Sequence, residues 1–193
     1  MTGTTFIGPE LISKRLQLLR EVVPKLSRVA ALWHPHAYSE NTMTGVRKEI
    51  ESAAATLGLQ LQLVPADSPD DIVSALTVIT QERADALILL PSPMLFGEYP
   101  RIASIAATRG LPAIGAAREF ADFGGLMAYG VNLPDLALHT AVYVDKILKG
   151  AKPAELPVQQ PTKFELVINL KAAKSLSLDV PPALIARADE VIE

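Results

Sequence analysis

Residues 28–51, RVAALWHPHAYSENTMTGVRKEIE, decide the fold. They open with an apolar run, 29–33, and continue through a polar loop, 34–39. The segment that follows has apolar or small residues at every third or fourth position. This succession predicts a buried strand, a loop at its carboxyl end and an amphipathic helix. Small ligands dock at such places in open α/β sheets, because strand ends and helix starts converge there.

The same alternation continues along the chain. Strands are expected at 59–64, 84–90 and 112–115, with helices between them. The helix that follows 59–64 is expected to begin near Pro69. The run 84–90, ADALILL, is typical of a strand covered on both faces. We therefore expect an α/β fold with an open parallel sheet flanked by helices and joined by right-handed crossovers. The remaining expected elements are a helix at 9–22, a strand at 126–129, a helix at 135–148, a proline-rich connector at 151–161, a strand at 164–170 and two short helices.

Composition bounds the function. The chain has 193 residues, a net charge of −3 and no cysteine. The charge balance argues against nucleic acid as a partner. The lack of cysteine excludes disulfides, thiolate catalysis and cysteine-based metal sites, and it suits an oxidising compartment. No apolar run approaches the roughly 20 residues of a membrane span. The start, MTGTT, lacks the features of a signal peptide, so the chain as given is expected in the cytoplasm unless its natural amino terminus lies upstream.

The candidate ligand-binding residues follow the ends of the expected strands. Polar residues at the start of the helix after 34–39 could hold a carboxylate or polar head, although simple helix capping is an equal alternative. Two loop residues after 84–90 could form an apolar wall or merely pack. An acidic residue near 119 could hold an amine or form a surface ion pair, and two residues after 126–129 could face a cleft. The candidates are Ser39, Asn41, Thr42, Pro93, Phe96, Glu119, Tyr129 and Asn132.

Neither catalysis nor metal binding is indicated. His34 and His36 lie two residues apart, but no third ligand stands at a spacing typical of zinc sites. The sequence lacks a GxGxxG motif, a Walker loop, a nucleophile elbow and a pair of catalytic carboxylates. We therefore predict no catalytic residue, no metal and no cofactor.

Longer blocks carry a family resemblance. They are GPELISKRLQLLREVVP, ADALILLPSP, REFADFGGLMAYGVN, YVDKILKGAKPAELPVQQPTKFELVINLKAAKSL and the closing PPALIARADEVIE. Together they resemble the ABC-transporter substrate-binding family with the type I periplasmic-binding fold. In that family a secretion signal and a whole first lobe precede the segment equivalent to residues 2–5. The resemblance implies crossings between lobes near residue 4, at 119–125 and at 151–156. Residues 1–118 plus 157–193 would then form the second lobe, and 119–156 a strand–helix crossover belonging to the missing first lobe.

The resemblance implies a function without chemistry. The chain would be the non-enzymatic component of an ABC-type uptake transporter that binds a small amino-acid-like solute, with a membrane permease as partner and the periplasm as location. The apolar face of 119–156 would either pack on its own sheet or form a homodimer with the same segment of a second copy. The alternatives are a truncated oligomerising fragment without ligand function and a flavodoxin-like enzyme.

Overall fold

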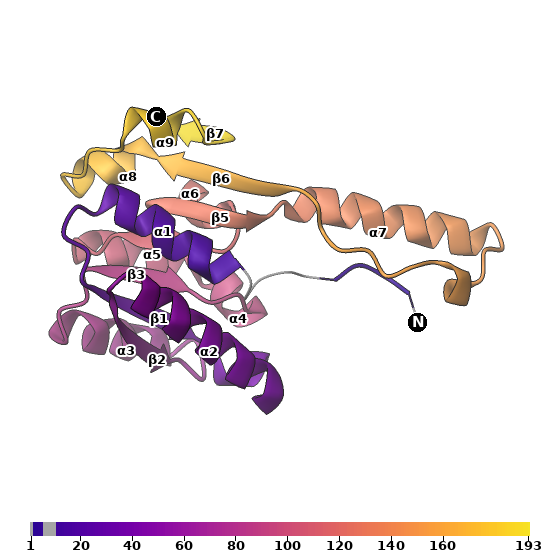
Figure 1. Ribbon diagram of the computed structural model, residues 1–193, viewed down its shortest axis with the longest axis horizontal. Coiled ribbons are helices and arrows are strands. Elements are labelled where there is room, and N and C mark those ends of the chain that lie inside the picture. The colour runs from indigo at the N-terminus through magenta and orange to yellow at the C-terminus, as the bar shows by residue number, and fades with distance from the viewer. Residues whose placement is uncertain (1, 6–10) are drawn as a thin grey trace.

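Seven strands form one sheet in the order β2-β1-β3-β4-β5-β6-β7 in the described part of the chain. The computed structural model describes residues 2–5 and 11–193 (Figure 1). The strands are β1 (Arg28–Trp33), β2 (Gln60–Pro65), β3 (Ala86–Leu89), β4 (Ala113–Gly115), β5 (Met127–Val131), β6 (Phe164–Asn169) and β7 (Glu190–Ile192). All neighbours are parallel except β5 and β6. The expected open, mostly parallel sheet is therefore confirmed.

Helices cover both faces of the sheet. They are α1 (Ile12–Val22), α2 (Glu40–Thr56), α3 (Asp71–Gln81), α4 (Pro93–Gly97), α5 (Tyr99–Thr108), α6 (Glu119–Asp122), α7 (Leu133–Leu148), α8 (Leu170–Ser175) and α9 (Pro182–Ile185). Helices α1 and α2 pack on one face, and α3, α4 and α5 pack on the other. The helix expected at 9–22 begins at Ile12 among the described residues, and Pro9 lies outside them.

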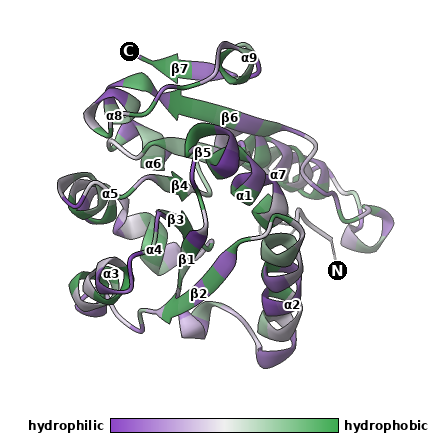
Figure 2. Ribbon diagram, turned by 60° about the vertical axis from the view of Figure 1, so that its left-hand side comes forward, coloured by the Kyte–Doolittle hydropathy of each residue, from purple (hydrophilic) through white to green (hydrophobic). Residues whose placement is uncertain are grey.

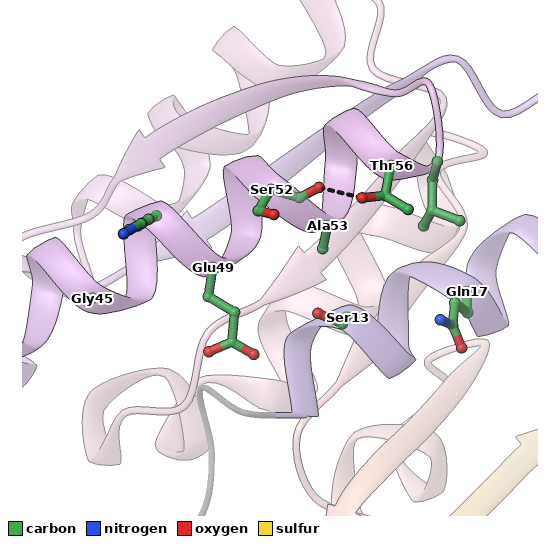
Figure 3. A pocket seen from close by; sticks show the side chains of 9 residues that line it. Ser13, Gln17, Gly45, Glu49, Ser52, Ala53 and Thr56 are labelled. Carbon is green, nitrogen blue, oxygen red and sulfur yellow. Dashed lines mark hydrogen bonds between the residues drawn. The ribbon is translucent and has the colours of Figure 1, made fainter.

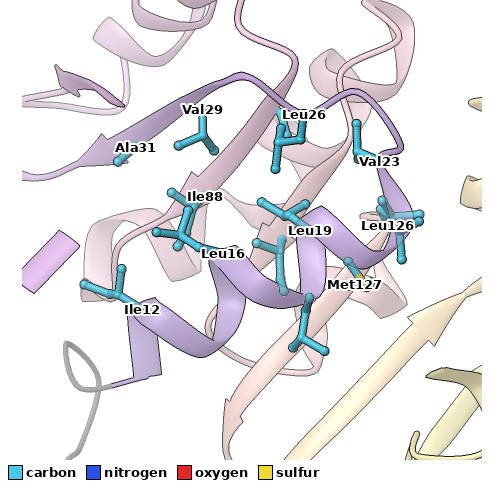
Figure 4. Packing of buried hydrophobic residues seen from close by; sticks show 14 of the residues in the cluster. Ile12, Leu16, Leu19, Val23, Leu26, Val29, Ala31, Ile88, Leu126 and Met127 are labelled. Atoms are coloured by element: carbon cyan, nitrogen blue, oxygen red, sulfur yellow. The ribbon is translucent and has the colours of Figure 1, made fainter. Parts of the chain in front are cut away.

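The core follows from the alternation of side chains along each strand. Val29 and Ala31 of β1 face the α1 side, where Ile12, Leu16 and Leu19 meet them (Figure 4). Ala30 and Leu32 face the α5 side. Every residue of β3 is buried, as expected for a strand covered on both faces. Apolar residues correspondingly dominate β6 and the central strands in Figure 2.

One expectation is wrong: the strand at 126–129 does not need a missing lobe. Strand β5 pairs in parallel with β4 and antiparallel with β6, so hydrogen bonds are made on both of its edges. Leu126 and Met127 are buried in the core of the same sheet. The crossing expected at 119–125 is wrong as well, because this segment forms α6 and a turn, with Phe120 buried. The segment that extends away from the sheet and its covering helices begins after β5, at Asn132, whose backbone N–H donates to the carbonyl of Lys163 on the returning segment.

Residues 133–163, here called the arm, stand away from the sheet (Figure 1). The hydroxyl of Tyr143 in α7 donates to the carbonyl of Pro157 over 2.7 Å. The segment 2–5 lies alongside, since Thr4 pairs with Gln159 in an isolated parallel bridge. The apolar face of α7 is nevertheless open: Leu138 is 68% exposed and Leu148 is 82% exposed. The helical half of the expected crossover therefore does extend from the body, and the division of the chain into two lobes stays a prediction.

Three local features differ from expectation. The loop expected after β3 contains the short helix α4, because the Ser92 side chain accepts a hydrogen bond from the backbone N–H of Leu95. The helix expected to begin near Pro69 begins at Asp71, whose carboxylate accepts hydrogen bonds from Ser68. Strand β7 was not expected. Among the helices of the described residues, none combines the length and the apolar character needed to cross a bilayer.

Candidate functional site

The carboxyl ends of β1, β3, β4 and β5 meet at one edge of the sheet, here called the carboxyl edge. The strand order reverses at β1, because β2 lies on one side of it and β3 on the other. The loops that follow β1 and β3 therefore diverge and leave a crevice, the usual ligand position in open α/β sheets.

A pocket of about 310 Å³ lies in this crevice. Tyr38 comes from the loop after β1, and its hydroxyl donates to the carbonyl of Pro91 in the loop after β3. Phe96 of α4 and Leu133 at the start of α7 add apolar surface. The full lining is Ala37, Tyr38, Pro91, Ser92, Pro93, Phe96 and Leu133. This volume and apolar lining fit a small organic ligand.

Two of the expected site residues, Pro93 and Phe96, lie in the pocket wall. The Phe96 ring meets the edge of the Tyr99 ring at 5.3 Å between centroids. Tyr99 in turn contacts Phe120 at 5.1 Å. This aromatic row anchors the pocket wall to the core on the α5 side. Whether Pro93 and Phe96 touch a ligand stays a prediction.

The polar candidates on α2 lie outside this pocket. Ser39, Asn41 and Thr42 are exposed at the first turn of the helix. The Ser39 side chain accepts a hydrogen bond from the backbone N–H of Thr42 at 3.2 Å. The capping alternative is therefore observed, and ligand binding by these three residues stays a prediction.

The remaining candidates lie at the ends of β4 and β5. Glu119 begins α6 and is half-buried. Tyr129 lies in β5, and its backbone carbonyl accepts a hydrogen bond from the side chain of Arg15. Asn132 caps α7 by accepting from the N–H of Asp135, and its side-chain amide donates to Glu165 over 2.9 Å. The partners Arg15 and Glu165, and the pocket residue Tyr38, were not among the site residues expected from the sequence.

Unsatisfied polar atoms gather at this edge. Of the seven buried side-chain nitrogen and oxygen atoms that lack a hydrogen-bond partner among the described residues, six belong here. They are both terminal nitrogens of Arg15, Nε1 of Trp33, Nδ1 of His34, Oε2 of Glu119 and Oε1 of Glu165. Buried polar groups in proteins are nearly always paired, so such a cluster indicates a place where a ligand or another segment completes the bonds.

Electrostatics at this edge are dominated by burial. Burial lowers the pKa of Arg15 to about 10, so the guanidinium remains charged at neutral pH. Burial raises the pKa of Tyr38 to about 12, although the nearby charge of Arg15 opposes the shift. Burial also raises the pKa of Tyr99.

The histidine pair does not extend to a metal centre among the described residues. The rings of His34 and His36 lie edge to face at 5.7 Å between centroids. Within residues 2–5 and 11–193, no group of three or more His, Cys, Asp or Glu side chains is placed to hold a metal ion.

A second hollow, of about 430 Å³, lies between α1 and α2 (Figure 3). It is lined by surface residues of the two helices, among them Ser13, Gln17, Glu49 and Ser52. None of its lining residues carries one of the buried unpaired atoms. Although this groove is larger, the carboxyl edge combines a pocket with unmet hydrogen bonds and is the better candidate.

Comparisons with known proteins agree with this geometry. A crystal structure from Vibrio cholerae, described as a conserved domain protein, matches with a TM-score of 0.87 and 26% identity, over 98% of this chain and 62% of that one. The ABC domain in complex with L-Trp from Streptococcus pneumonia matches with a TM-score of 0.87 and 27% identity, over 99% of this chain and 63% of that one. This chain thus spans less than two thirds of either protein.

More distant structures share the fold alone. An ABC transporter solute binding protein from Agrobacterium vitis, bound with alpha-D-tagatopyranose, matches with a TM-score of 0.65 and 14% identity, over 97% of this chain and 62% of that one. A search of curated proteins found no match. A family model described as ABC transporter substrate binding protein matches residues 1–192, which confirms the expected family. The chain therefore belongs to the ABC transporter substrate binding protein family.

Proposed function

We propose that this chain is the non-enzymatic solute-binding component of an ABC-type uptake transporter and binds a small amino-acid-like solute at the carboxyl edge. The observation that carries the proposal is the pocket at the point where the strand order reverses, in a chain of a substrate-binding family. A relative of 27% identity is described in complex with L-Trp. The apolar wall at Phe96 and Leu133 suits an apolar side chain of similar kind.

The chain would supply one wall of the complete site. Because it spans only 62–63% of its relatives, we infer that a further segment closes over the solute in the assembled protein. The polar candidates Ser39, Asn41 and Thr42 would meet the polar head of the solute. The carboxylate of Glu119 would accept a hydrogen bond from the amine of the solute. Tyr129 and Asn132 would face the closing segment. One wall buries only part of a ligand, so this chain alone would bind weakly.

Calorimetric titration with the twenty L-amino acids tests this function. We expect saturable binding of at least one apolar amino acid. Phe96→Ser should weaken it at least ten-fold, because the pocket wall loses its ring. Phe123→Ser is the matched control, since Phe123 is 52% exposed and outside the pocket. The proposal fails if no amino acid binds, or if both variants lose binding equally.

Family membership also suggests the partners and the location. We infer a membrane permease as partner and the periplasm as compartment, with which the absence of cysteine is compatible. Co-purification of the tagged chain with the permease subunits in detergent tests the partnership. Fractionation of the native host tests the compartment.

The open face of α7 favours a second candidate function, self-association through the arm. Leu138, Val142 and Leu148 are each more than half exposed. Burying such a side chain is worth about 1.5–3 kcal/mol. If a homodimer forms this way, light scattering should show a dimer that the double change Leu138→Ser with Val142→Ser converts to a monomer. A wild-type monomer at all concentrations rules the dimer out. A dimer that binds no solute identifies an oligomerising fragment.

A further inference from the structure

Arg15 occupies a position on α1 that the helical pattern reserves for apolar residues. It lies three residues after Ile12 and four before Leu19, and all three side chains are fully buried. Its Nε donates to the carbonyl of Tyr129 over 2.7 Å. Its two terminal nitrogens have no hydrogen-bond partner among the described residues. Nor does any described acidic side chain form an ion pair with it within 4.0 Å.

A buried guanidinium without a counter-ion costs free energy. Three tyrosines, Tyr38, Tyr99 and Tyr129, lie close enough to Arg15 to interact with it electrostatically. Burial raises the pKa of Tyr38 and of Tyr99, so these two phenols supply no counter-ion at neutral pH. Two of these hydroxyls have other hydrogen-bond partners. Tyr38 donates to the carbonyl of Pro91, and the Tyr99 oxygen accepts from the backbone N–H of Ala116 at 3.1 Å. The described residues therefore surround a cation and leave two of its donor nitrogens free.

Tyr38 connects this cation to the pocket. Its side chain lines the pocket, and it is one of the three tyrosines that feel the charge of Arg15. Its hydroxyl bond to Pro91 joins the two loops that form the crevice. Arg15 is fully buried and does not itself line the pocket, so a ligand in the pocket reaches the guanidinium only after the Tyr38 side chain rotates and gives up this bond. The pocket itself offers apolar surface, so a ligand that spans both places carries an apolar body and an anionic group.

Glu119 supplies a complementary charge. Tyr99 interacts electrostatically with both Arg15 and Glu119, so the two opposite charges lie near one phenol. No ion pair joins them among the described residues, and Oε2 of Glu119 is buried without a partner. A carboxylate contact at Arg15 and the proposed amine contact at Glu119 together suit a zwitterion of the α-amino-acid type.

Resting on the proposed function, we propose that Arg15 is the receptor for the carboxylate of the bound solute and that Tyr38 is the gate over it. Arg15 matches a carboxylate bidentately through its two free terminal nitrogens. The expected solutes are therefore carboxylic acids with an apolar side chain. The corresponding amides lack the negative charge that Arg15 would pair with, and we expect them to bind poorly.

Matched acids and amides test the assignment. The probes are L-tryptophan, L-phenylalanine and L-leucine, each against its primary amide, titrated into the whole chain by calorimetry. Wild-type protein should bind each acid that binds at all at least ten-fold more tightly than its amide. Arg15→Met should bring the two affinities within about two-fold of each other. Arg20→Met is the control on the exposed face of the same helix and should keep the wild-type ratio.

Thermal unfolding without ligand separates this role from a structural one. If Arg15 waits for an anion, Arg15→Met should match or exceed the wild-type melting temperature, because it removes an uncompensated buried charge. If Arg15 is structural, the variant should melt well below wild type, and the proposal is overturned. Arg15→Lys keeps the charge but not the planar fork of the guanidinium, so it should retain part of the preference for acids.

The remaining outcomes are equally decisive. Equal binding of acid and amide by the wild type overturns the role of Arg15 and leaves solute binding in place. If Arg15→Met still prefers the acid over the amide, the role of Arg15 is likewise overturned and solute binding stays in place. Absence of any binding by the wild type overturns the proposed function itself.

Discussion

The two edges of the sheet differ in whether their buried polar groups have hydrogen-bond partners. At the amino edge, where β1 and β3 begin, the carboxylate of Asp85 accepts hydrogen bonds from the N–H of Ser27 at 2.9 Å and of Arg28 at 2.8 Å. It also accepts one from the Ser27 hydroxyl at 3.0 Å. The Arg28 side chain donates to the Gln60 side chain and to the carbonyl of Glu82. The named polar groups at this edge are paired.

At the carboxyl edge, Arg15, Trp33, His34, Glu119 and Glu165 all retain buried atoms that have no partner within residues 2–5 and 11–193. Both edges belong to the same sheet and terminate the same strands, so the fold itself does not demand the difference. Unmet hydrogen bonds cost stability. The comparison teaches that the amino edge pairs its named polar groups within the fold, while the carboxyl edge leaves several unpaired among the described residues, as the proposed binding site requires.

The largest effect is expected where the backbone of the carboxyl edge is tightest. A Cβ atom at Gly130 would lie 1.8 Å from the carbonyl oxygen of Ala116. Gly130→Ala should therefore force β4 and β5 apart and lower the free energy of unfolding by about 3 kcal/mol, measured in urea. Gly45→Ala is the control, because nothing lies within 4 Å of a Cβ there and Gly45 is inside α2. It should stabilise the protein by roughly 0.5–1 kcal/mol. If both variants changed the free energy of unfolding equally, the close approach of Gly130 to Ala116 would be contradicted.

The next effect concerns the paired edge. Asp85→Asn removes the charge. Its amide oxygen can take the place of Oδ2, which accepts all three hydrogen bonds, but those bonds are then no longer charge-assisted and are weaker. We expect a loss of about 2 kcal/mol in the free energy of unfolding at pH 7. Chemical denaturation of the variant and of wild type under identical conditions gives the difference. A change of less than a few tenths of a kcal/mol would contradict the view that pairing at this edge stabilises the fold.

The contribution of the Asp85 carboxylate to stability should also depend on pH. Burial raises the pKa of Asp85, but the hydrogen bonds from Arg28 and Ser27 outweigh it, so the net pKa lies below its ordinary value. A depressed pKa contributes stability that is present above the unfolded-state value of about 3.9 and is lost as pH falls through the folded-state value. Wild-type stability should therefore decline below about pH 4 more steeply than that of Asp85→Asn. Parallel curves would show that Asp85 does not carry the acid sensitivity.

The smallest effect is expected from the equivalent change at the unpaired edge. Glu165 is buried, and its Oε1 has no partner among the described residues. Glu165→Gln removes a buried charge and keeps an oxygen for the Asn132 amide, so stability should change by no more than about 0.5 kcal/mol or increase. Urea unfolding of this variant beside Asp85→Asn compares the same chemical change at both edges. A loss as large as that of Asp85→Asn would remove the distinction between them.

Local patterns carried much of the fold. The apolar run at 84–90 and the spacing in 28–51 contain the reason for β3, β1 and α2, because alternation and helical periodicity are local properties. The placement of Pro93 and Phe96 near the pocket could be predicted, because both residues follow a buried strand in the sequence. Arg15 left a signal that was missed, a charge at an apolar position of the α1 stripe between Ile12 and Leu19.

The pairing of strands that are distant along the chain could not be predicted from the sequence. Nothing local distinguishes a strand that crosses to another lobe from one that inserts beside β4, so residues 126–129 were misplaced. The choice rests on hydrogen bonds to residues 114–115 and 164–168, which are distant along the chain. The contacts of Asn132 with Glu165 and of Arg15 with Tyr129 depend on the same pairing.

By itself the sequence determined the family, the alternation of strands and helices, and the edge of the sheet that carries a pocket, because these follow from local periodicity and extended motifs. Only the tertiary structure decided which strands are neighbours, that α7 rather than β5 leaves the body, and which buried polar atoms stay unpaired. Those outcomes depend on the pairing of segments far apart in the chain, and a hydrogen bond is known to be missing only when every possible partner has been placed.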